Sequence, residues 1–440
     1  MDTNSGEKTR TTKATVRATF LNVLIWLAAA IALFFIGRHF SHRSVDFIVY
    51  YKAAGSFLAG RRDLYSATFA WGPPMEYVYP PLFLFLYFPL GWLPFADAFG
   101  LWFAAMALAT FLVVRLAHRE WHALSMREYG LIAVAVAAVP VLYALRNGNV
   151  HLGIVLITVA GLVAWSRGKL WAASFYIALG GAIKIFPLFL FPFLIARREW
   201  RFAVRLALVS VVLWALPVLY YGPSQTLSLY RSWHQHVGGD VEHFESVHQL
   251  DSSLTGTTRR WLSHVDYSRY RDQDHPQVNR MDLSAGTVRG VSLVLRGLTM
   301  AVALLLAGVL PKSKRDPGDA PPSLEVAAIG ALFITSQLLF GPYTIFLYLC
   351  EWLVVALTLP VVFQTRAPRV NYWLLAIGVV SLAVLSVPGR SAHRALEAYG
   401  AYTFLNVGLW LISLAAAWTW LRTSKPRIPT EEREPIVHDA

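Results

Sequence analysis

Residues 95–116 read FADAFGLWFAAMALATFLVVRL, a run in which only Asp97 and Arg115 are charged. A helix of this length rises about 33 Å, which is enough to cross the hydrocarbon core of a bilayer. The whole chain agrees, because 56% of its 440 residues are hydrophobic and 15% are charged, whereas soluble domains carry about a quarter charged residues. The sequence therefore predicts a helical membrane protein and excludes a soluble enzyme, a disordered scaffold and a disulfide-rich secreted module.

Further apolar runs of spanning length occur along the chain: Phe20–Gly37, Tyr129–Leu145, Val150–Trp165, Phe202–Tyr221, Val288–Leu310, Leu324–Phe340, Tyr343–Phe363, Tyr372–Val387 and Tyr402–Leu421. Leu170–Ala196 is longer than one crossing and is interrupted by glycines and prolines, so we expect two short, tilted helices with Lys184 near the break. Pro80–Pro94 is apolar but short and rich in proline. We expect this segment to dip into the membrane without crossing it.

Basic residues collect in one set of short loops, and cytoplasmic loops are the ones that retain Lys and Arg. With the N-terminus inside, Arg197, Arg198 and Lys312 fall in inner loops, while the outer turn Gly341-Pro342 carries no charge. This pattern predicts about 12 crossings with both termini in the cytoplasm. The formal net charge of +13 then belongs mainly to the inner membrane surface, so we expect membrane lipid and no nucleic acid as a partner.

The topology divides the chain into a cytoplasmic N-terminal segment, a single membrane domain and a cytoplasmic tail, at residues 1–19, 20–421 and 422–440. Two long polar segments, 41–94 and 222–285, fall on the outer face, where we expect chemistry or binding. In Asp46–Gly60, apolar residues recur at helical spacing and predict an amphipathic helix at the membrane interface. The only cysteine, Cys350, lies in an apolar run and excludes an internal disulfide.

Asp46 begins the predicted amphipathic helix and permits two interpretations. A carboxylate at a helix start suits an N-cap, which is the commoner role of aspartate in such a position. A carboxylate held at the outer membrane boundary and partly desolvated also suits a general base that removes a proton from a hydroxyl. Tyr79, which precedes the apolar dip, is either an interface aromatic residue or part of the same site.

Lys184 lies inside the apolar block Gly180–Pro187. A lysine at membrane depth is costly unless its amine reaches the interface or meets an anion. The neighbouring glycines and Pro187 indicate an interrupted helix, whose free N–H groups also bind anions. Phosphate binding is the sharper hypothesis for Lys184, and a side chain that snorkels to the interface is the alternative.

Two polar stretches on the outer side also carry candidates. Arg146-Asn-Gly-Asn149, followed by His151, is either a tight turn or a place where Asn149 and His151 meet a sugar or phosphate. The run from Gln249 ends in Arg259 and Arg260. Adjacent arginines suit bidentate phosphate contacts, although solvated charge is the commoner explanation. His234-x-His236 has one metal-ligand spacing but no third ligand nearby in the sequence.

Common soluble-enzyme motifs are absent from the sequence. It contains no P-loop, no Gly-rich dinucleotide fingerprint, no Gly-x-Ser-x-Gly elbow and no His-Glu-x-x-His pair. A membrane enzyme without nucleotide machinery, with its polar segments outside, would have to use an activated donor dissolved in the membrane.

Several short segments, taken in order, resemble the polytopic glycosyltransferases of the GT-C superfamily, and most closely family 87, whose members use polyprenyl-phosphate mannose. The matching segments are Asp46-x-x-x-Tyr-Tyr-x-Ala-Ala, Gly60-x-x-Asp-Leu-Tyr65, Tyr79-Pro-Pro-Leu, Asn147-Gly-Asn149, Ala182-Ile-Lys-Ile-Phe-Pro187 and Gln249-x-x-Ser-Ser-Leu-x-Gly-x-x-Arg-Arg260. The resemblance implies an all-α GT-C-type bundle of about 12 transmembrane helices, with amphipathic and re-entrant helices in the first outer segment.

The resemblance also implies a function. It predicts an integral membrane glycosyltransferase that transfers a sugar, expected to be mannose, from a polyprenyl-phosphate donor to a lipid or glycan acceptor, with inversion. The reaction would occur on the extracytoplasmic face of the plasma membrane, with Asp46 as the general base and without a metal or other cofactor.

Further residues take roles from the same resemblance. The donor phosphate would be bound by Lys184, Arg259, Arg260 and Lys52. Substrate contacts are expected from Tyr50, Tyr79, Asn149, His248, Gln249 and Tyr343. Many relatives carry a Ser-Pro-x-x-Trp-x-His-like segment late in the chain, whereas residues 340–348 here contain no histidine. Tyr343 or His248 would then substitute, or the acceptor differs.

Two functions of another class compete with this prediction. A transporter or flippase of a polyprenyl-linked glycan would use Lys184 and the broken helices as a transport site. Transporters commonly show inverted repeats and charges on several helices, whereas no repeat is evident here and polar residues gather on one face. A non-catalytic assembly subunit would not depend on Asp46.

Overall fold

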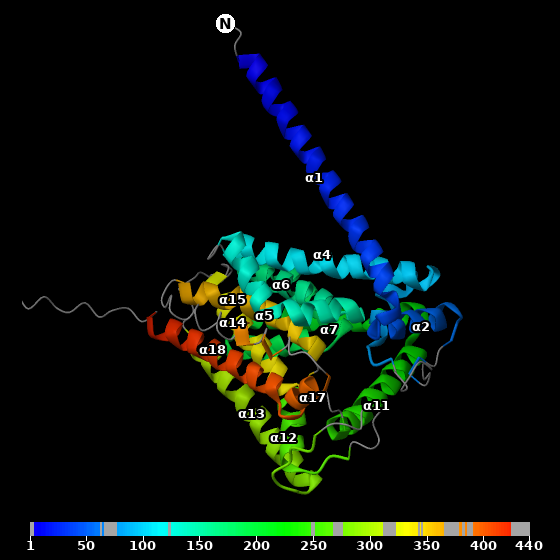
Figure 1. The fold of residues 1–440 in the computed structure, drawn as a ribbon, viewed down its shortest axis with the longest axis vertical. Helices are drawn as coiled ribbons and strands as arrows, with labels where there is room; N and C mark the ends of the chain where they lie inside the picture. Colours follow the sequence, from blue (N-terminus) through cyan, green and yellow to red (C-terminus); the bar gives the residue numbers. More distant parts are fainter. Residues whose placement is uncertain are drawn as a thin grey trace, which may run out of the picture.

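The computed structural model describes residues 4–61, 64–65, 77–121, 125–247, 251–266, 276–310, 323–341, 344, 346–364, 378–380, 383–384 and 390–423. Every regular element within these ranges is a helix. Figure 1 shows α4 (Phe95–Trp121), α5 (Met126–Asn147), α6 (His151–Ser166) and α7 (Leu170–Ile183) together in a bundle. The first helix, α1 (Asn4–Phe40), projects from this bundle with its N-terminal end.

Seven stretches among the described residues are long and apolar enough to cross a membrane. They belong to α1, α4, α5, α9 (Trp200–Ala215) with α10 (Val218–Tyr221), α13 (Ala285–Val309), α14 (Ser323–Phe340) and α18 (Ala401–Thr423). Shorter apolar helices include α6, α7, α8 (Leu190–Ala196) and α15 (Trp352–Gln364). The chain is therefore a multi-pass helical membrane protein, as predicted, while the number of about 12 crossings, the orientation and the domain boundaries stay predictions.

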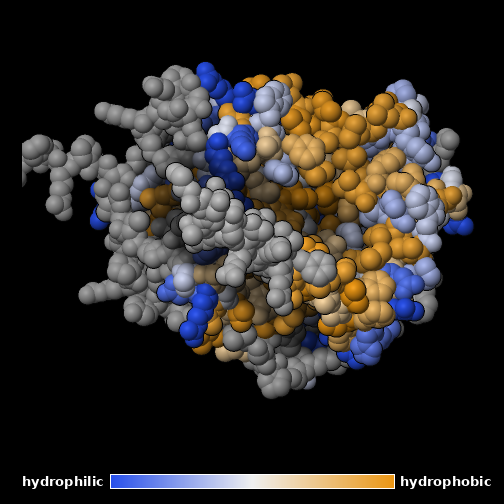
Figure 2. All heavy atoms as spheres, turned by 90° about the horizontal axis from the view of Figure 1, so that it is seen from above, coloured by the Kyte–Doolittle hydropathy of each residue, from blue (hydrophilic) through white to orange (hydrophobic). Residues whose placement is uncertain are grey.

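The surface supports this assignment. Large apolar side chains on α9 and α13 are exposed, among them Val211 and Leu305, each 69% accessible. Figure 2 shows broad apolar areas bordered by hydrophilic residues. Apolar patches of this extent are unfavourable in water but match the hydrocarbon of a bilayer.

The long apolar segment breaks where the sequence predicts. Helix α7 ends at Ile183, Lys184 adopts an extended conformation, and a short 3₁₀ helix, η3 (Phe186–Phe189), leads into α8. Pro187 lacks an N–H group and cannot continue α7, which explains the interruption. The amine of Lys184 therefore extends from an unwound stretch between two short helices.

Within residues 41–94, short helices form where the sequence predicts them. The amphipathic helix is α2 (Asp46–Leu58), and the apolar dip forms α3 (Pro81–Tyr87) and the 3₁₀ helix η2 (Phe88–Trp92), both too short to span a bilayer. The second outer segment contains α11 (Pro223–Val247) and α12 (Leu254–Leu262), which the sequence analysis did not anticipate. The expected span Tyr343–Phe363 becomes a 3₁₀ helix, η5 (Phe346–Glu351), followed by α15, and most of Tyr372–Val387 lies outside the described residues.

One ion pair is completely buried among the helices. Arg197, at the end of α8, pairs through Nη2 with Glu325 Oε1 of α14 and donates from Nη1 to the carbonyls of Ala307 at 2.8 Å and Leu310 at 3.4 Å. Both charged side chains have no exposed surface. The sequence placed Arg197 among the solvated charges of an inner loop, whereas the structure uses it to join α8, α13 and α14.

Replacing Arg197 with Met should strongly destabilise the protein, because the buried Glu325 carboxylate would lose its ion pair with the guanidinium. The expected loss is about 3–5 kcal/mol in the free energy of unfolding. Thermal unfolding of the detergent-solubilised protein measures it. The neighbouring variant Arg198→Met provides the control because Arg198 is exposed, and equal melting temperatures for both variants would contradict the prediction.

Candidate active site

A left-handed residue at the end of α5 positions Asn149. Gly148 caps α5 with φ 72°, a conformation that glycine adopts without strain. A Cβ atom on Gly148 would lie 2.6 Å from Cβ of Phe47 in α2, so the absent side chain also permits the close approach of the two segments. The indole Nε1 of Trp102 donates to the Gly148 carbonyl at 2.8 Å. The Asn-Gly turn signal is confirmed, and it directs Asn149 toward α2.

Asp46 uses its carboxylate in a long-range contact. The N-cap of α2 is Val45, which makes no side-chain capping bond, and Asp46 is the first helical residue. The N-cap interpretation of Asp46 is therefore wrong. Its Oδ2 instead accepts a hydrogen bond from Nδ2 of Asn149 at 3.0 Å. The carboxylate is half-buried.

Two tyrosine hydroxyls lie beside this carboxylate. The hydroxyls of Tyr50, one turn after Asp46, and Tyr79 are 2.7 Å apart, and the backbone N–H of Val150 donates to Tyr50 at 3.4 Å. Burial raises the pKa of both phenols, and the nearby charge of Asp46 raises each pKa further. Both hydroxyls therefore stay protonated at neutral pH and offer polar hydrogen-bonding groups.

The electrostatics of Asp46 reflect opposing effects. Burial raises the pKa of this carboxyl, whereas the hydrogen bond from Asn149 and the positive charge of Lys184 lower it. Burial has the largest effect, so the pKa lies above its ordinary value of 3.8. An aspartate with a raised pKa is a stronger proton acceptor when ionised.

Lys184 lies among aromatic rings on the same side. Its Nζ is 3.7 Å from the ring centroid of Tyr348, 5.3 Å from that of Phe186 and 5.6 Å from that of Tyr79. A lysine ammonium within about 6 Å of an aromatic ring face gains cation–π stabilisation. The structure thus brings Lys184 together with Asp46, Tyr50, Tyr79 and Asn149.

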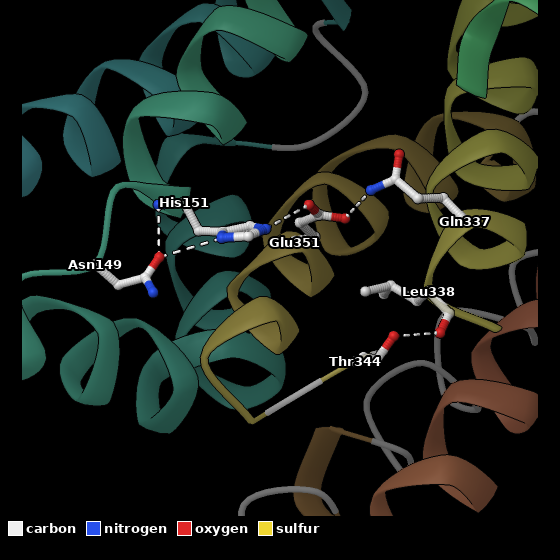
Figure 3. Close-up of polar contacts among 6 residues, drawn as sticks. All are labelled: Asn149, His151, Gln337, Leu338, Thr344 and Glu351. Carbon is white, nitrogen blue, oxygen red and sulfur yellow. Dashed lines mark hydrogen bonds and ion pairs between the residues drawn. The ribbon is translucent and has the colours of Figure 1, made fainter. Parts of the chain in front are cut away.

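A line of buried polar residues lies behind Asn149 (Figure 3). The sequence analysis named His151 but missed Glu351 and Gln337. Oδ1 of Asn149 lies 3.1 Å from Nδ1 of His151, whose Nε2 lies 3.4 Å from Oε1 of Glu351. Oε2 of Glu351 accepts from Nε2 of Gln337 at 2.6 Å. Glu351 and Gln337 stand inside two apolar runs of spanning length, and a search for polar residues within such runs would have found them.

The imidazole of His151 also contacts the segment that lacks the family histidine. Its ring stacks on Tyr348 with a centroid distance of 4.1 Å and an interplanar angle of 22°. Tyr343 and His248, the residues expected to substitute, lie outside the described residues, as does Gln249. An imidazole from α6 therefore packs against the 340–348 segment.

A second polar cluster holds the start of α12. Oδ1 of Asp251 accepts from the backbone N–H groups of Ser253 at 2.8 Å and Thr344 at 2.9 Å.

Arg260 is buried and donates to the Asp251 carbonyl at 2.7 Å, to Thr257 Oγ1 at 3.1 Å and to the Ala398 carbonyl at 3.2 Å. These contacts give Arg260 a role in holding the outer segment together.

Arg259 and Lys52 are also predicted to bind the donor phosphate. Arg259 is half-buried on α12, which in Figure 1 lies away from α2. Lys52 is half-buried on α2. Donor binding by Arg259, Arg260 and Lys52 stays a prediction. Within the part of the chain that the structure describes, no group of three His, Cys, Asp or Glu side chains has the arrangement of a metal site.

Residues 77–342, more than half of the chain, match the family model of glycosyltransferase family 87. The chain belongs to glycosyltransferase family 87. The match includes Tyr79, Asn149 and Lys184, while Asp46 precedes it and Glu351 follows it. The family recognised from the short sequence segments is thereby confirmed.

This family 87 protein is similar to two curated mycobacterial enzymes. An alpha-(1->3)-arabinofuranosyltransferase of Mycobacterium tuberculosis is 28% identical over 257 residues, which cover 53% of this chain and 55% of that protein. A polyprenol-phosphate-mannose-dependent alpha-(1-2)-phosphatidylinositol pentamannoside mannosyltransferase of Mycolicibacterium smegmatis is 27% identical over 161 residues, 36% of this chain and 38% of that protein. The chain spans about half the length, or less, of the curated relatives it matches.

Among solved structures, ArnT from Cupriavidus metallidurans in the apo state aligns with a TM-score of 0.38 and 14% sequence identity. The alignment covers 92% of this chain and 78% of that chain.

The Asp251 cluster of the family 87 protein should make its stability depend on pH. Burial raises the pKa of Asp251 from 3.8 to about 6, although hydrogen bonds from Thr344 and Ser253 lower it. The folded state therefore binds the proton more tightly than the unfolded state. Relative to Asp251→Asn, the wild type should be most stable below about pH 4 and should lose at most about 3 kcal/mol as pH rises through 6.

Thermal unfolding of both proteins between pH 4 and pH 7 measures this difference. Asp282→Asn removes an exposed carboxylate and controls for the loss of one acid. A stability difference between wild type and Asp251→Asn that is independent of pH would refute the prediction.

Proposed function

We propose that the protein is a membrane glycosyltransferase in which Asp46 acts as the general base. It transfers a sugar from a polyprenyl-phosphate donor to a hydroxyl of a lipid or glycan acceptor, with inversion, at the extracytoplasmic face of the plasma membrane. The observation that carries this proposal is the placement of a half-buried Asp46 carboxylate, held by Asn149, beside the cation Lys184. Family membership supports the class of reaction.

The proposed reaction needs two charges of opposite sign near one another. Asp46 accepts the proton of the acceptor hydroxyl, and the hydroxyl oxygen forms a bond to the anomeric carbon of the donor sugar. The bond from this carbon to the phosphate oxygen breaks, and the lipid phosphate leaves with the electron pair. Because negative charge grows on the phosphate in the transition state, the ammonium of Lys184 stabilises it.

The polar groups around Asp46 suit the recognition of a sugar or acceptor. Tyr50 and Tyr79 are neutral hydroxyls that donate and accept hydrogen bonds. Aromatic rings at Tyr79, Phe186 and Tyr348 surround the Lys184 amine and lower the polarity of its environment. A cation in such surroundings interacts more strongly with a phosphate than one in bulk water does.

The names of the two relatives point to different sugars. One name describes a mannosyltransferase that depends on polyprenol-phosphate mannose, and the other an arabinofuranosyltransferase. We retain mannose as the expected sugar and include arabinofuranose as the second donor in every assay. Both sugars would be presented on a lipid phosphate, so the proposed roles of Asp46 and Lys184 are the same for each.

Replacing Asp46 with Asn should reduce sugar transfer by about 10²–10⁴-fold, because the amide keeps the size of the side chain but cannot accept the proton. Membranes carrying the variant are supplied with polyprenyl-phosphate mannose or arabinofuranose, and transfer to lipid is measured. Asp97→Asn is the matched control, since Asp97, in the first turn of α4, is a partly exposed carboxylate that pairs with Arg38. Undiminished transfer by the Asp46 variant, with normal expression, would favour the flippase or assembly-subunit hypotheses.

The transfer rate should fall at low pH as Asp46 becomes protonated, and the fall should begin above the ordinary aspartate range because burial raises this pKa. In Lys184→Met the cation that lowers the Asp46 pKa is lost. The acidic limb of the pH–rate profile should therefore move to higher pH, and KM for the donor should rise. Lys169→Met, which changes an exposed lysine, serves as the control, and an unchanged limb and KM in Lys184→Met would argue against the proposed role of Lys184.

A further inference from the structure

The hydrogen bonds around Asn149 determine which end of its amide faces Asp46. Oδ1 accepts from the backbone N–H of His151 at 2.8 Å, so this atom is the oxygen. Nδ2 then donates to the Asp46 carboxylate at 3.0 Å. Because an amide oxygen only accepts hydrogen bonds, the contact of 3.1 Å to Nδ1 of His151 requires that Nδ1 carry a hydrogen.

The hydrogen on Nδ1 determines how His151 meets Glu351. With a hydrogen on Nδ1, a neutral imidazole has a lone pair on Nε2, which faces Oε1 of Glu351 at 3.4 Å. Two facing lone pairs would repel each other, so this pair at ion-pair distance is favourable only when the ring or the carboxyl carries a proton. Gln337 donates to the other oxygen of Glu351 at 2.6 Å and thereby leaves Oε1 to face the imidazole.

We propose that His151, Glu351 and Gln337 are positioning residues, which hold the Asn149 amide in the one orientation that presents its NH₂ group to Asp46. None of the three needs to touch substrate. Their effect on the reaction passes through Asn149, which sets the direction of the Asp46 carboxylate. This inference rests on the proposed role of Asp46 as the base.

His151, Glu351 and Gln337 are buried, and this burial explains why three residues act on the orientation of the one Asn149 amide. His151 is completely buried, and Glu351 and Gln337 are 2% and 3% exposed. Water therefore does not replace a contact that is lost between these residues. Tyr348 stacks on the imidazole ring and restrains its rotation. The ring is thus held by a stacking contact, by Asn149 and by Glu351.

Substitutions at His151 separate positioning from packing. His151→Phe keeps an aromatic ring against Tyr348 but removes both ring nitrogens, and kcat should fall by about 10–100-fold with little change in KM for the donor. In His151→Asn the side-chain NH₂ occupies the place of Nδ1 and can still donate to Asn149. This variant should therefore recover most of the lost kcat, to within about threefold of wild type.

Substitutions at Glu351 test whether its negative charge is needed to orient His151. In Glu351→Gln the new amide can donate to Nε2 of His151 and accept from Gln337, so kcat should stay within about threefold of wild type. Glu351→Ala leaves Nε2 without a partner and should lower kcat by about tenfold or more. A double-mutant cycle of Asn149→Ala with His151→Phe should show strong non-additivity, because both changes remove the same constraint on Asp46.

Each variant is purified in detergent and assayed with polyprenyl-phosphate mannose and arabinofuranose, and kcat is normalised to the folded fraction from thermal unfolding. The inference is overturned if folded His151→Phe keeps wild-type kcat, if His151→Asn is no better than His151→Phe, or if Glu351→Gln loses as much activity as Glu351→Ala. Transfer retained in Asp46→Asn would instead refute the proposed function. The two failures are therefore distinguishable.

Discussion

The hydrogen bond from Asn149 to Asp46 joins two parts of the chain that are 103 residues apart in sequence. It connects the first residue of the amphipathic helix α2 to the turn between α5 and α6. The contact forms because Gly148 adopts a left-handed conformation and leaves space for Phe47. All the chemistry proposed for the protein depends on it, because an aspartate without this partner would be an ordinary interfacial carboxylate.

The site combines charged groups that are individually unfavourable inside an apolar helix bundle. A carboxylate, a lysine amine and a histidine–glutamate pair lie close together, where each isolated charge would be costly. They are tolerated because each has a partner: Asn149 for Asp46, aromatic rings for Lys184, and Gln337 for Glu351. Elsewhere in the bundle, Arg197 and Glu325 likewise tolerate burial because each faces the opposite charge, and their pair joins helices.

The two long polar segments, 41–94 and 222–285, contribute in different ways. The first supplies Asp46, Tyr50 and Tyr79, all in contact with or close to one another. In the second, Arg260 is engaged by Asp251, Thr257 and Ala398 and stabilises the start of α12. Thr344 links the second segment to α14, because its backbone N–H donates to Asp251 and its hydroxyl donates to the Leu338 carbonyl next to Gln337 (Figure 3).

The sequence by itself determined the helical membrane fold, the break at Lys184, the amphipathic helix and the family, because hydrophobic period, proline and glycine positions and short motifs act locally along the chain. It also brought forward Asp46, Asn149 and Lys184 as separate candidates. Only the tertiary structure decided that these residues meet, that Asp46 is not an N-cap, that Arg260 is bonded to protein oxygens, and that Glu351 and Gln337 stand behind His151. Such contacts depend on which helices pack together, and no local pattern in the sequence records that choice.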